Sequence, residues 1–182
     1  MQRPSFKDLE EKLQYHFQNP QYLITAMTHS SYANEVKSGG HSNERLEFLG
    51  DSVLSIVVAD YLFKHCPNLP EGELTKNRAA LVCEKALCGF SRQLGLGEYL
   101  LLSRGEQNSG GRQRSSILAD AFEALIAAIY LDAGLEKARE FILRFVLPVL
   151  QTSRPKAFKD YKTSLQEIIQ QNPEEQLEYV LI

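Results

Sequence analysis

Apolar residues recur every three or four positions along most of this chain, which is the spacing of a helix rather than the alternation of a half-buried strand. Phe6, Leu9, Leu13 and Phe17 begin the pattern. Neither a strand-like alternation nor an internal repeat interrupts it before residue 155. The pattern therefore predicts an all-α fold for the larger, N-terminal part of the chain.

Prolines, glycines and polar runs divide this pattern into segments. Ser42 or Asn43 is placed to cap one long helix, and Thr75 is placed to cap another. Gly95 and Gly97 mark the end of the second of these helices. Together the signals predict helices over residues 20–27, 44–65, 75–93, 116–131 and 135–150.

Two polar stretches are expected to be loops. Residues 33–43 contain a glycine pair and several Ser and Asn residues. Residues 103–115 are rich in Gly and Ser and carry three arginines, among them Arg112 and Arg114. We expect this second stretch to be a mobile basic loop whose arginines are candidates for phosphate contact.

Three carboxylates interrupt the apolar positions of the predicted helix 44–65. Glu44, Glu47 and Asp51 are three and four residues apart, so they share one side of the helix and repel one another. Ionised carboxylates that face an apolar interior cost several kcal/mol each unless a cation neutralises them. Since no Lys or Arg lies on that side, the pattern indicates a hard divalent cation such as Mg²⁺.

A second pair of carboxylates lies in the predicted helix 116–131, which is apolar nearly all round and should be buried. Asp120 and Glu123 are three residues apart and share one face. Two buried helices with such pairs could together build one metal site of four carboxylates. The alternative is that each pair lies on a solvated helix face.

The net charge argues weakly against a nucleic-acid partner. The 182 residues include 20 basic and 23 acidic side chains, for a net charge of −3, whereas proteins that bind polyanions usually carry a basic surplus. Carboxylates covered by a metal would account for part of the acidic excess. Apolar and charged contents of 43% and 24% are ordinary for a soluble globular protein.

The cysteines and the apolar runs indicate the cellular compartment in which the protein is expected. The odd count of three, Cys66, Cys83 and Cys88, and the absence of a C-x-x-C spacing argue against a disulfide framework or a zinc site. The N-terminus lacks the apolar core of a signal peptide, and charged residues interrupt every long apolar run. We therefore expect a cytoplasmic protein with reduced, mostly buried thiols and no membrane partner.

Four ordered blocks of sequence resemble the ribonuclease III family. The run ERLEFLGDSVL at 44–54 is similar to the family's diagnostic motif, and SILADAFEALIAAIYLDAG at 116–134 to its second block. The segments THSSY at 28–32 and PEGELT at 70–75 match two further landmarks. The resemblance implies a ribonuclease III catalytic domain over residues 1–150. It also implies a metal-dependent endonuclease that cuts double-stranded RNA, including ribosomal and other precursors, and leaves 5′-phosphate and 3′-hydroxyl ends.

The resemblance also assigns roles to individual carboxylates. It implies that Glu47, Asp51, Asp120 and Glu123 bind Mg²⁺, or Mn²⁺ in its place, and that Asp51 and Glu123 are catalytic. For two further carboxylates, a functional role and a simple surface role both remain possible. Glu44 is a candidate for orienting a ligand or binding substrate, and Glu71 a candidate for approaching the site from a partner subunit.

Phe48 stands beside the carboxylates but points away from Glu47, because adjacent helical residues do not share a face. The resemblance implies that Phe48 enters a pocket on a second copy and so forms a homodimer. Two sites related by a two-fold axis could then each cut one strand of a duplex. The alternative is that Phe48 belongs to the core of the monomer.

The C-terminal residues change in character. Residues 151–158 read as a linker, and 159–182 resemble the opening helix and first strand of an α/β double-stranded-RNA-binding domain. By that resemblance Thr163, Gln166 and Glu167 face the minor groove. A fragment of this size cannot bury its apolar face alone, so we expect the domain to be truncated here.

Two other functions deserve comparison with a nuclease. A non-catalytic double-stranded-RNA-binding protein on the same fold is disfavoured, because all four ligand positions hold Asp or Glu. A di-iron carboxylate protein is excluded, because it needs Glu-x-x-His pairs and no histidine of this chain follows a Glu by three residues. His29, within the Thr-His-Ser block, is interpreted as a buried hydrogen-bonding residue rather than a base.

Overall fold

The computed structural model describes residues 5–36 and 41–152 of the chain. The chain divides into two compact units, residues 1–147 and residues 148–182. Most of the predicted linker at 151–158 and all of the RNA-binding segment at 159–182 lie outside the described residues. The roles of Thr163, Gln166 and Glu167 therefore stay predictions.

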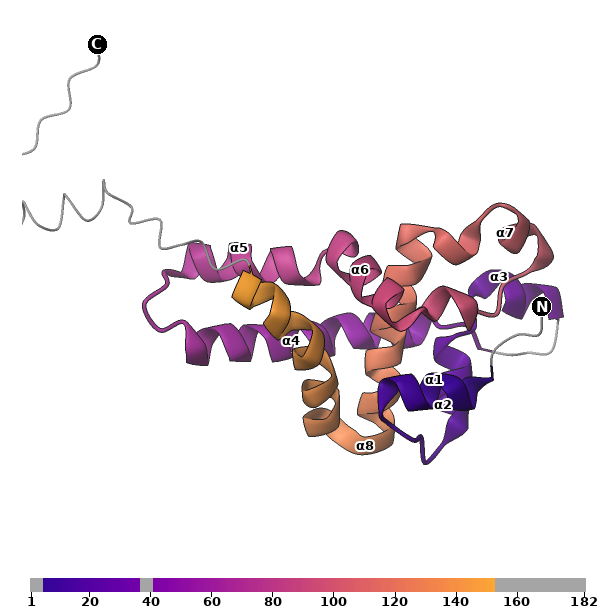
Figure 1. Ribbon diagram of the computed structural model, residues 1–182, viewed down its shortest axis with the longest axis horizontal. Coiled ribbons are helices and arrows are strands. Elements are labelled where there is room, and N and C mark those ends of the chain that lie inside the picture. The colour runs from indigo at the N-terminus through magenta and orange to yellow at the C-terminus, as the bar shows by residue number, and fades with distance from the viewer. Residues whose placement is uncertain (1–4, 37–40, 153–182) are drawn as a thin grey trace, which may run out of the picture. The chain divides into compact units, whose positions relative to one another are not determined.

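Helices account for all the regular structure of the described residues, which contain no strand, so the predicted all-α fold is confirmed (Figure 1). One isolated parallel bridge joins Thr28 to Leu101. The elements are α1 Phe6–Leu13, α2 Pro20–Ala26, α3 Ser30–Val36, α4 Glu44–His65, α5 Glu71–Val82, α6 Glu84–Leu94, the 3₁₀ helix η1 Leu96–Glu98, α7 Arg104–Asn108, the 3₁₀ helix η2 Gly111–Gln113, and α8 Ser115–Thr152.

Helix α4 ends where the sequence predicts, at His65, but begins without the predicted side-chain cap. Asn43 occupies the N-cap position, yet its side chain makes no capping bond and its buried Nδ2 has no partner. The Ser42 hydroxyl instead donates to the Glu44 carboxylate at 2.8 Å. The start of α4 is held by its backbone, because the Asn43 N–H donates to the Thr28 carbonyl at 2.8 Å.

The prediction of one helix over residues 75–93 is wrong. The helix begins earlier, at Glu71, and Cys83 breaks it by adopting an extended backbone with ψ of 155°. Thr75 lies inside α5, where its hydroxyl donates to the Glu71 carboxylate and caps nothing. The predicted stop is confirmed at Gly95, which ends α6 in the left-handed region at φ of 69°.

Both predicted loops contain helix. Helix α3 extends to Val36, so the loop expected over residues 33–43 is wrong at its start. The stretch 103–115 forms α7 and η2 in place of a mobile loop. Arg112 donates to the carbonyls of Gly97 and Leu100, and Arg114 pairs with Glu106 at 2.7 Å. These arginines stabilise the fold, because they satisfy backbone carbonyls and a carboxylate.

Helix α8 consists of two segments, because Gly134 leaves the helical region with φ of 85° and ψ of 179°. The first segment is buried nearly all round, as its sequence predicts. The second segment returns along the first and packs on it through Phe141 and Phe145. Phe90 of α6 joins the same aromatic cluster around Phe122.

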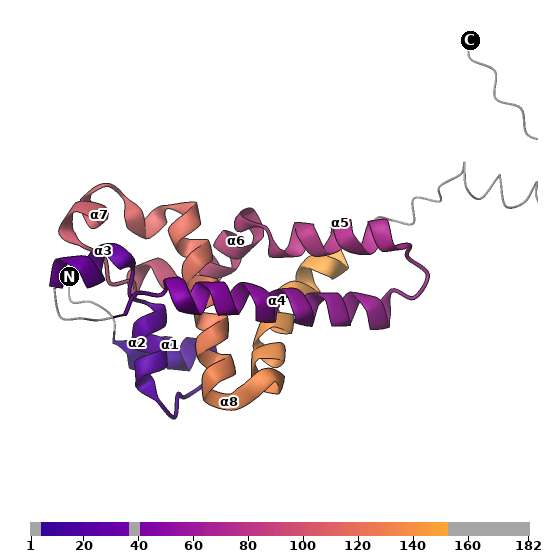
Figure 2. The ribbon, with the colours of Figure 1, turned by 180° about the vertical axis from the view of Figure 1, so that it is seen from behind.

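The closest approach of two helices decides where the functional side chains lie. Helix α4 crosses the first segment of α8 (Figure 2). A Cβ atom added to Gly50 would lie 1.9 Å from the carbonyl oxygen of Glu123, far inside van der Waals contact. The two backbones therefore touch at Gly50, and only glycine permits this approach.

The structure also tests the predicted burial of the thiols and shows whether a helix could span a membrane. Cys88 is buried, Cys66 is half-buried and Cys83 is exposed, and all three are free. The expectation of mostly buried thiols therefore holds fully only for Cys88. No helix among the described residues is both long enough and apolar enough to cross a bilayer.

Gly50→Ala is expected to lower the free energy of unfolding by about 1–3 kcal/mol or more, because the added methyl group forces α4 away from α8. Gly89→Ala on α6 is the matched control, since no atom lies within 4 Å of its added Cβ. That control should be neutral or stabilising by up to about 1 kcal/mol. Urea denaturation measures both, and equal stabilities of Gly50→Ala and the wild type would contradict the close contact.

Candidate metal centre

Three carboxylates meet where α4 crosses α8. One oxygen each of Glu47, Asp120 and Glu123 lies within 4.8 Å of the others, and all three side chains are half-buried. This is the only such group of His, Cys, Asp or Glu residues within 5–36 and 41–152. The crossing thus brings together three of the four residues predicted as ligands from positions more than 70 apart in the sequence.

Asp51, the fourth predicted ligand, lies one turn beyond Glu47 and is exposed. Its carboxylate is not a member of the tight group, yet it lies close enough to raise the pKa values of Glu47 and Glu123. Glu44 is likewise exposed and raises the pKa of Glu47. Both residues therefore flank the group on the α4 side.

Burial and mutual repulsion disfavour the charged state of this group. Desolvation, reinforced by Asp51, Glu47 and Asp120, raises the pKa of Glu123 from 4.5 to about 8. Desolvation, with Asp120, Glu44 and Asp51, also raises the pKa of Glu47. No ion pair among the described residues involves any of these five carboxylates.

This arrangement fits a hard divalent cation. Its donors are all carboxylate oxygens, which Mg²⁺ and Mn²⁺ prefer. Their repulsion is the electrostatic conflict that such a cation relieves. The residues that could hold the ion are Glu47, Asp120 and Glu123, with Asp51 able to join from the next turn of α4.

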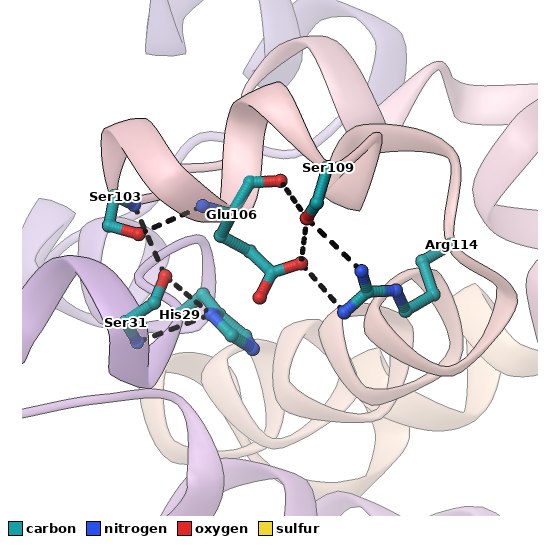
Figure 3. Close-up of polar contacts among 6 residues, drawn as sticks. All are labelled: His29, Ser31, Ser103, Glu106, Ser109 and Arg114. Atoms are coloured by element: carbon teal, nitrogen blue, oxygen red, sulfur yellow. Dashed lines mark hydrogen bonds and ion pairs between the residues drawn. The ribbon is translucent and has the colours of Figure 1, made fainter.

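Two further groups act on Asp120 and were not assigned to the site from the sequence. Desolvation raises the pKa of Asp120, His29 lowers it, and Glu84 at the start of α6 raises it. Neither shares an element or a sequence block with Asp120, so no local spacing could have revealed their effect on its pKa. His29 makes local hydrogen bonds as predicted, because its Nδ1 contacts Ser31 (Figure 3), but it is half-buried and not buried as predicted.

The other predicted residues lie apart from this group. Glu71 is exposed at the start of α5, where it lines a groove of about 360 Å³ between α4 and α5. Phe48 is 78% exposed. That exposure excludes the alternative that Phe48 belongs to the core of the monomer.

Comparison with known proteins decides the family. The family model described as Ribonuclease-III-like matches residues 19–150, which is most of the chain. The chain belongs to the ribonuclease III family. The resemblance to this family, which the sequence analysis based on four short blocks, is therefore confirmed over the catalytic region.

Individual members of the ribonuclease III family are similar over nearly the whole chain. Ribonuclease 3 of Clostridium tetani is 52% identical over 177 residues, covering 97% of this chain and 75% of the relative. Ribonuclease 3 of Bacillus cereus strain G9842 is 47% identical over 181 residues, covering 99% and 74%. The nuclease domain of ribonuclease III from Campylobacter jejuni has a TM-score of 0.74 and 44% identity, covering 79% of this chain and 97% of that domain.

Glu123→Gln is expected to stabilise the metal-free protein at neutral and higher pH. Because the folded-state pKa of Glu123 is raised, the folded state binds the proton more tightly than the unfolded state does. The wild type therefore loses stability as the pH rises from 4.5 towards about 8, whereas glutamine loses none at this position.

Urea denaturation of both proteins in EDTA, across that pH range, measures this difference. The stability advantage of Glu123→Gln should widen as the pH rises. Excess Mg²⁺ should then favour the wild type, since an ion that binds only the folded state stabilises it. Parallel pH dependences for the two proteins would contradict the raised pKa.

Proposed function

We propose that this protein is an endoribonuclease that hydrolyses phosphodiester bonds in double-stranded RNA and requires a divalent metal ion. The observation that carries the proposal is the group of Glu47, Asp120 and Glu123 at the crossing of α4 and α8, in a member of the ribonuclease III family. The expected products carry 5′-phosphate and 3′-hydroxyl ends. Ribosomal and other RNA precursors in the cytoplasm are the proposed substrates.

Mg²⁺ is the proposed ion, with Mn²⁺ as a substitute, and Glu47, Asp51, Asp120 and Glu123 are its proposed ligands. The ion supplies Lewis-acid stabilisation of the charge that develops on the phosphate. The chain's own residues orient that ion, and Glu123, the most strongly perturbed carboxylate, must give up its proton for the centre to form. Asp51 and Glu123 are proposed as the catalytic pair, with Glu44 as a supporting residue.

The retained carboxylates also weigh against the non-catalytic alternative. A protein that only binds double-stranded RNA gains nothing from half-buried, mutually repelling acids, because these groups destabilise the fold and repel phosphates. All four positions keep Asp or Glu, and three of them converge in space. We therefore favour the enzyme over a binding protein on the same fold.

A homodimer is proposed to form through α4. Phe48, Ile56 and Phe63 are 78%, 57% and 74% exposed. Because an α-helix has 3.6 residues per turn, these three positions fall on one side of α4. The solved Campylobacter jejuni domain is described as having a flexible region involved in dimer formation. On this proposal the groove between α4 and α5 receives a partner's side chain, and Glu71 on its rim approaches the partner's site.

Cleavage of a long RNA duplex should require Mg²⁺ or Mn²⁺ and stop in excess EDTA. Glu123→Gln should abolish cleavage, since the amide lacks the charge that binds the ion. Glu136→Gln, an exposed position on the second segment of α8, is the control and should cut at the wild-type rate. Gel analysis with end-labelled RNA measures all three proteins, and cleavage that persists in EDTA would overturn the metal-dependent mechanism.

Phe48→Ala should weaken association without lowering the stability of the subunit, because Phe48 is exposed in the single chain. Truncating an aromatic residue that a partner buries costs about 3–5 kcal/mol, so the variant should be monomeric at micromolar concentration. Light scattering measures the mass, with Leu135→Ala as a control for loss of an exposed apolar side chain elsewhere. A monomeric wild type would contradict the dimer, and a dimeric Phe48→Ala would place its interface elsewhere.

A further inference from the structure

A small cavity of about 180 Å³ lies where the end of α1 meets the two segments of α8 (Figure 1). Its floor is apolar, because Leu13 of α1, Ile129 of the first segment of α8 and Phe141 of the second segment are all buried. The charged residues that line it are Lys137, Glu140 and Arg144 of the second segment. An apolar floor beneath a few polar groups is typical of a site for a small ligand.

One wall of this cavity, formed by Tyr15, is fixed to α8. The Tyr15 hydroxyl donates to the carboxylate of Asp132, which lies near the end of the first segment of α8. The same carboxylate accepts the backbone N–H groups of Gln18 and Asn19, each at 2.8 Å. The turn after α1 is therefore held against α8, and the cavity is preformed.

Arg144 brings a positive charge to the cavity. Its Nη1 donates to the Leu13 carbonyl at 2.9 Å, and its guanidinium carbon lies 5.3 and 5.0 Å from the ring centres of Phe141 and Phe145. Among the described residues this side chain has no other hydrogen bond and no ion pair. A guanidinium has five N–H donors, so those of Nε and Nη2 remain for a ligand. Partial burial lowers the pKa of Arg144, since it costs the guanidinium part of its hydration.

Glu140 precedes Arg144 by about one turn of α8, which is the spacing of an ion pair on a helix. Its carboxylate instead pairs with Lys137 at 2.6 Å. The two cations and one carboxylate that line the cavity leave it a net charge of +1. The cavity therefore favours an anion, and a planar guanidinium can bind a carboxylate or a phosphate through two parallel N–H bonds.

The cavity is separate from the carboxylate group of the metal centre. Ile129 follows Asp120 by nine residues, which is about two and a half turns of helix, so the two side chains lie on opposite sides of the first segment of α8. They are also about 13 Å apart along the helix axis. A ligand of this cavity therefore does not share a site with the proposed metal ion.

We propose that this cavity binds a small organic anion. Its carboxylate or phosphate group accepts hydrogen bonds from Nε and Nη2 of Arg144, and its apolar part lies on Leu13, Ile129 and Phe141. The cavity is bounded by α1, the turn after it and both segments of α8, so its compact shape suits a small molecule rather than an extended peptide or an RNA strand. The proposal does not rest on the nuclease activity, because none of the proposed metal ligands lines the cavity.

The alternative is that Arg144 only stabilises the end of α1, where its Nη1 satisfies the carbonyl of the last helical residue. Three probe molecules separate the two roles. Phenyl phosphate carries both an anionic group and an apolar ring, whereas inorganic phosphate lacks the ring and benzyl alcohol lacks the charge. A site with an apolar floor and an arginine should bind phenyl phosphate more tightly than either of the others.

NMR titration of the isotope-labelled full chain with each probe, in EDTA so that no metal ion binds the phosphate, tests the proposal. Phenyl phosphate should shift the signals of Gln14, Lys137 and Arg144, with a millimolar dissociation constant, as expected for about eleven non-hydrogen atoms. Arg144→Gln should weaken its binding by about tenfold or more, because charge-assisted hydrogen bonds are lost. Arg92→Gln, which removes an exposed arginine from the last turn of α6, is the matched control and should bind as the wild type does.

Four results would each overturn the proposal. The first is the absence of any shift up to about 20 mM phenyl phosphate. The second is a set of shifts that maps away from the cavity, and the third is inorganic phosphate that binds as tightly as phenyl phosphate. The fourth is unchanged binding in a folded Arg144→Gln protein. If that variant is too unstable to measure, the shifts of the wild-type signals decide the proposal by themselves.

Discussion

Every proposed ligand depends on how closely the backbone of α4 approaches that of α8. At Gly50 this approach leaves no room for a Cβ atom, because the Glu123 carbonyl oxygen would lie 1.9 Å from it. Glu47 precedes Gly50 by one turn of α4, and Asp120 precedes Glu123 by about one turn of α8. Side chains only a few atoms long can therefore reach a common point from two helices. A wider crossing would separate them by more than one ion could bridge.

This closeness creates the electrostatic conflict from which the proposed chemistry follows. Desolvation and repulsion raise the pKa values of Glu47 and Glu123, so the bare group opposes folding as the pH rises. The fold offsets that cost elsewhere, through the buried first segment of α8 and the aromatic cluster around Phe122. Functional sites commonly hold such unfavourable arrangements within a well-packed surrounding structure. The proposed ion would neutralise the repelling carboxylates, so their repulsion favours binding of the ion.

The sequence predicts those features of the fold that depend on local spacing. The ends of α4 at His65 and of α6 at Gly95, and the burial of the first segment of α8, follow from apolar periodicity and a glycine stop. The break at Cys83 carries no Gly or Pro, and the helical turns after Ser103 lie in a Gly- and Ser-rich stretch, so local rules misassign both. Nor could spacing reveal that His29 and Glu84 influence the pKa of Asp120, because the three residues belong to different parts of the sequence.

Helix α4 has to satisfy three environments at once. Leu54, Val57 and Leu62 face the core, the carboxylates face α8 or solvent, and Phe48 and Phe63 remain exposed. An ordinary surface helix has one apolar stripe and one polar face. An apolar side exposed to water on a single chain is unfavourable. Burial of this side against the proposed partner explains why α4 retains it. Since Phe48 directly follows Glu47, any movement of α4 at the proposed dimer contact also moves a proposed metal ligand, and association and catalysis should respond together.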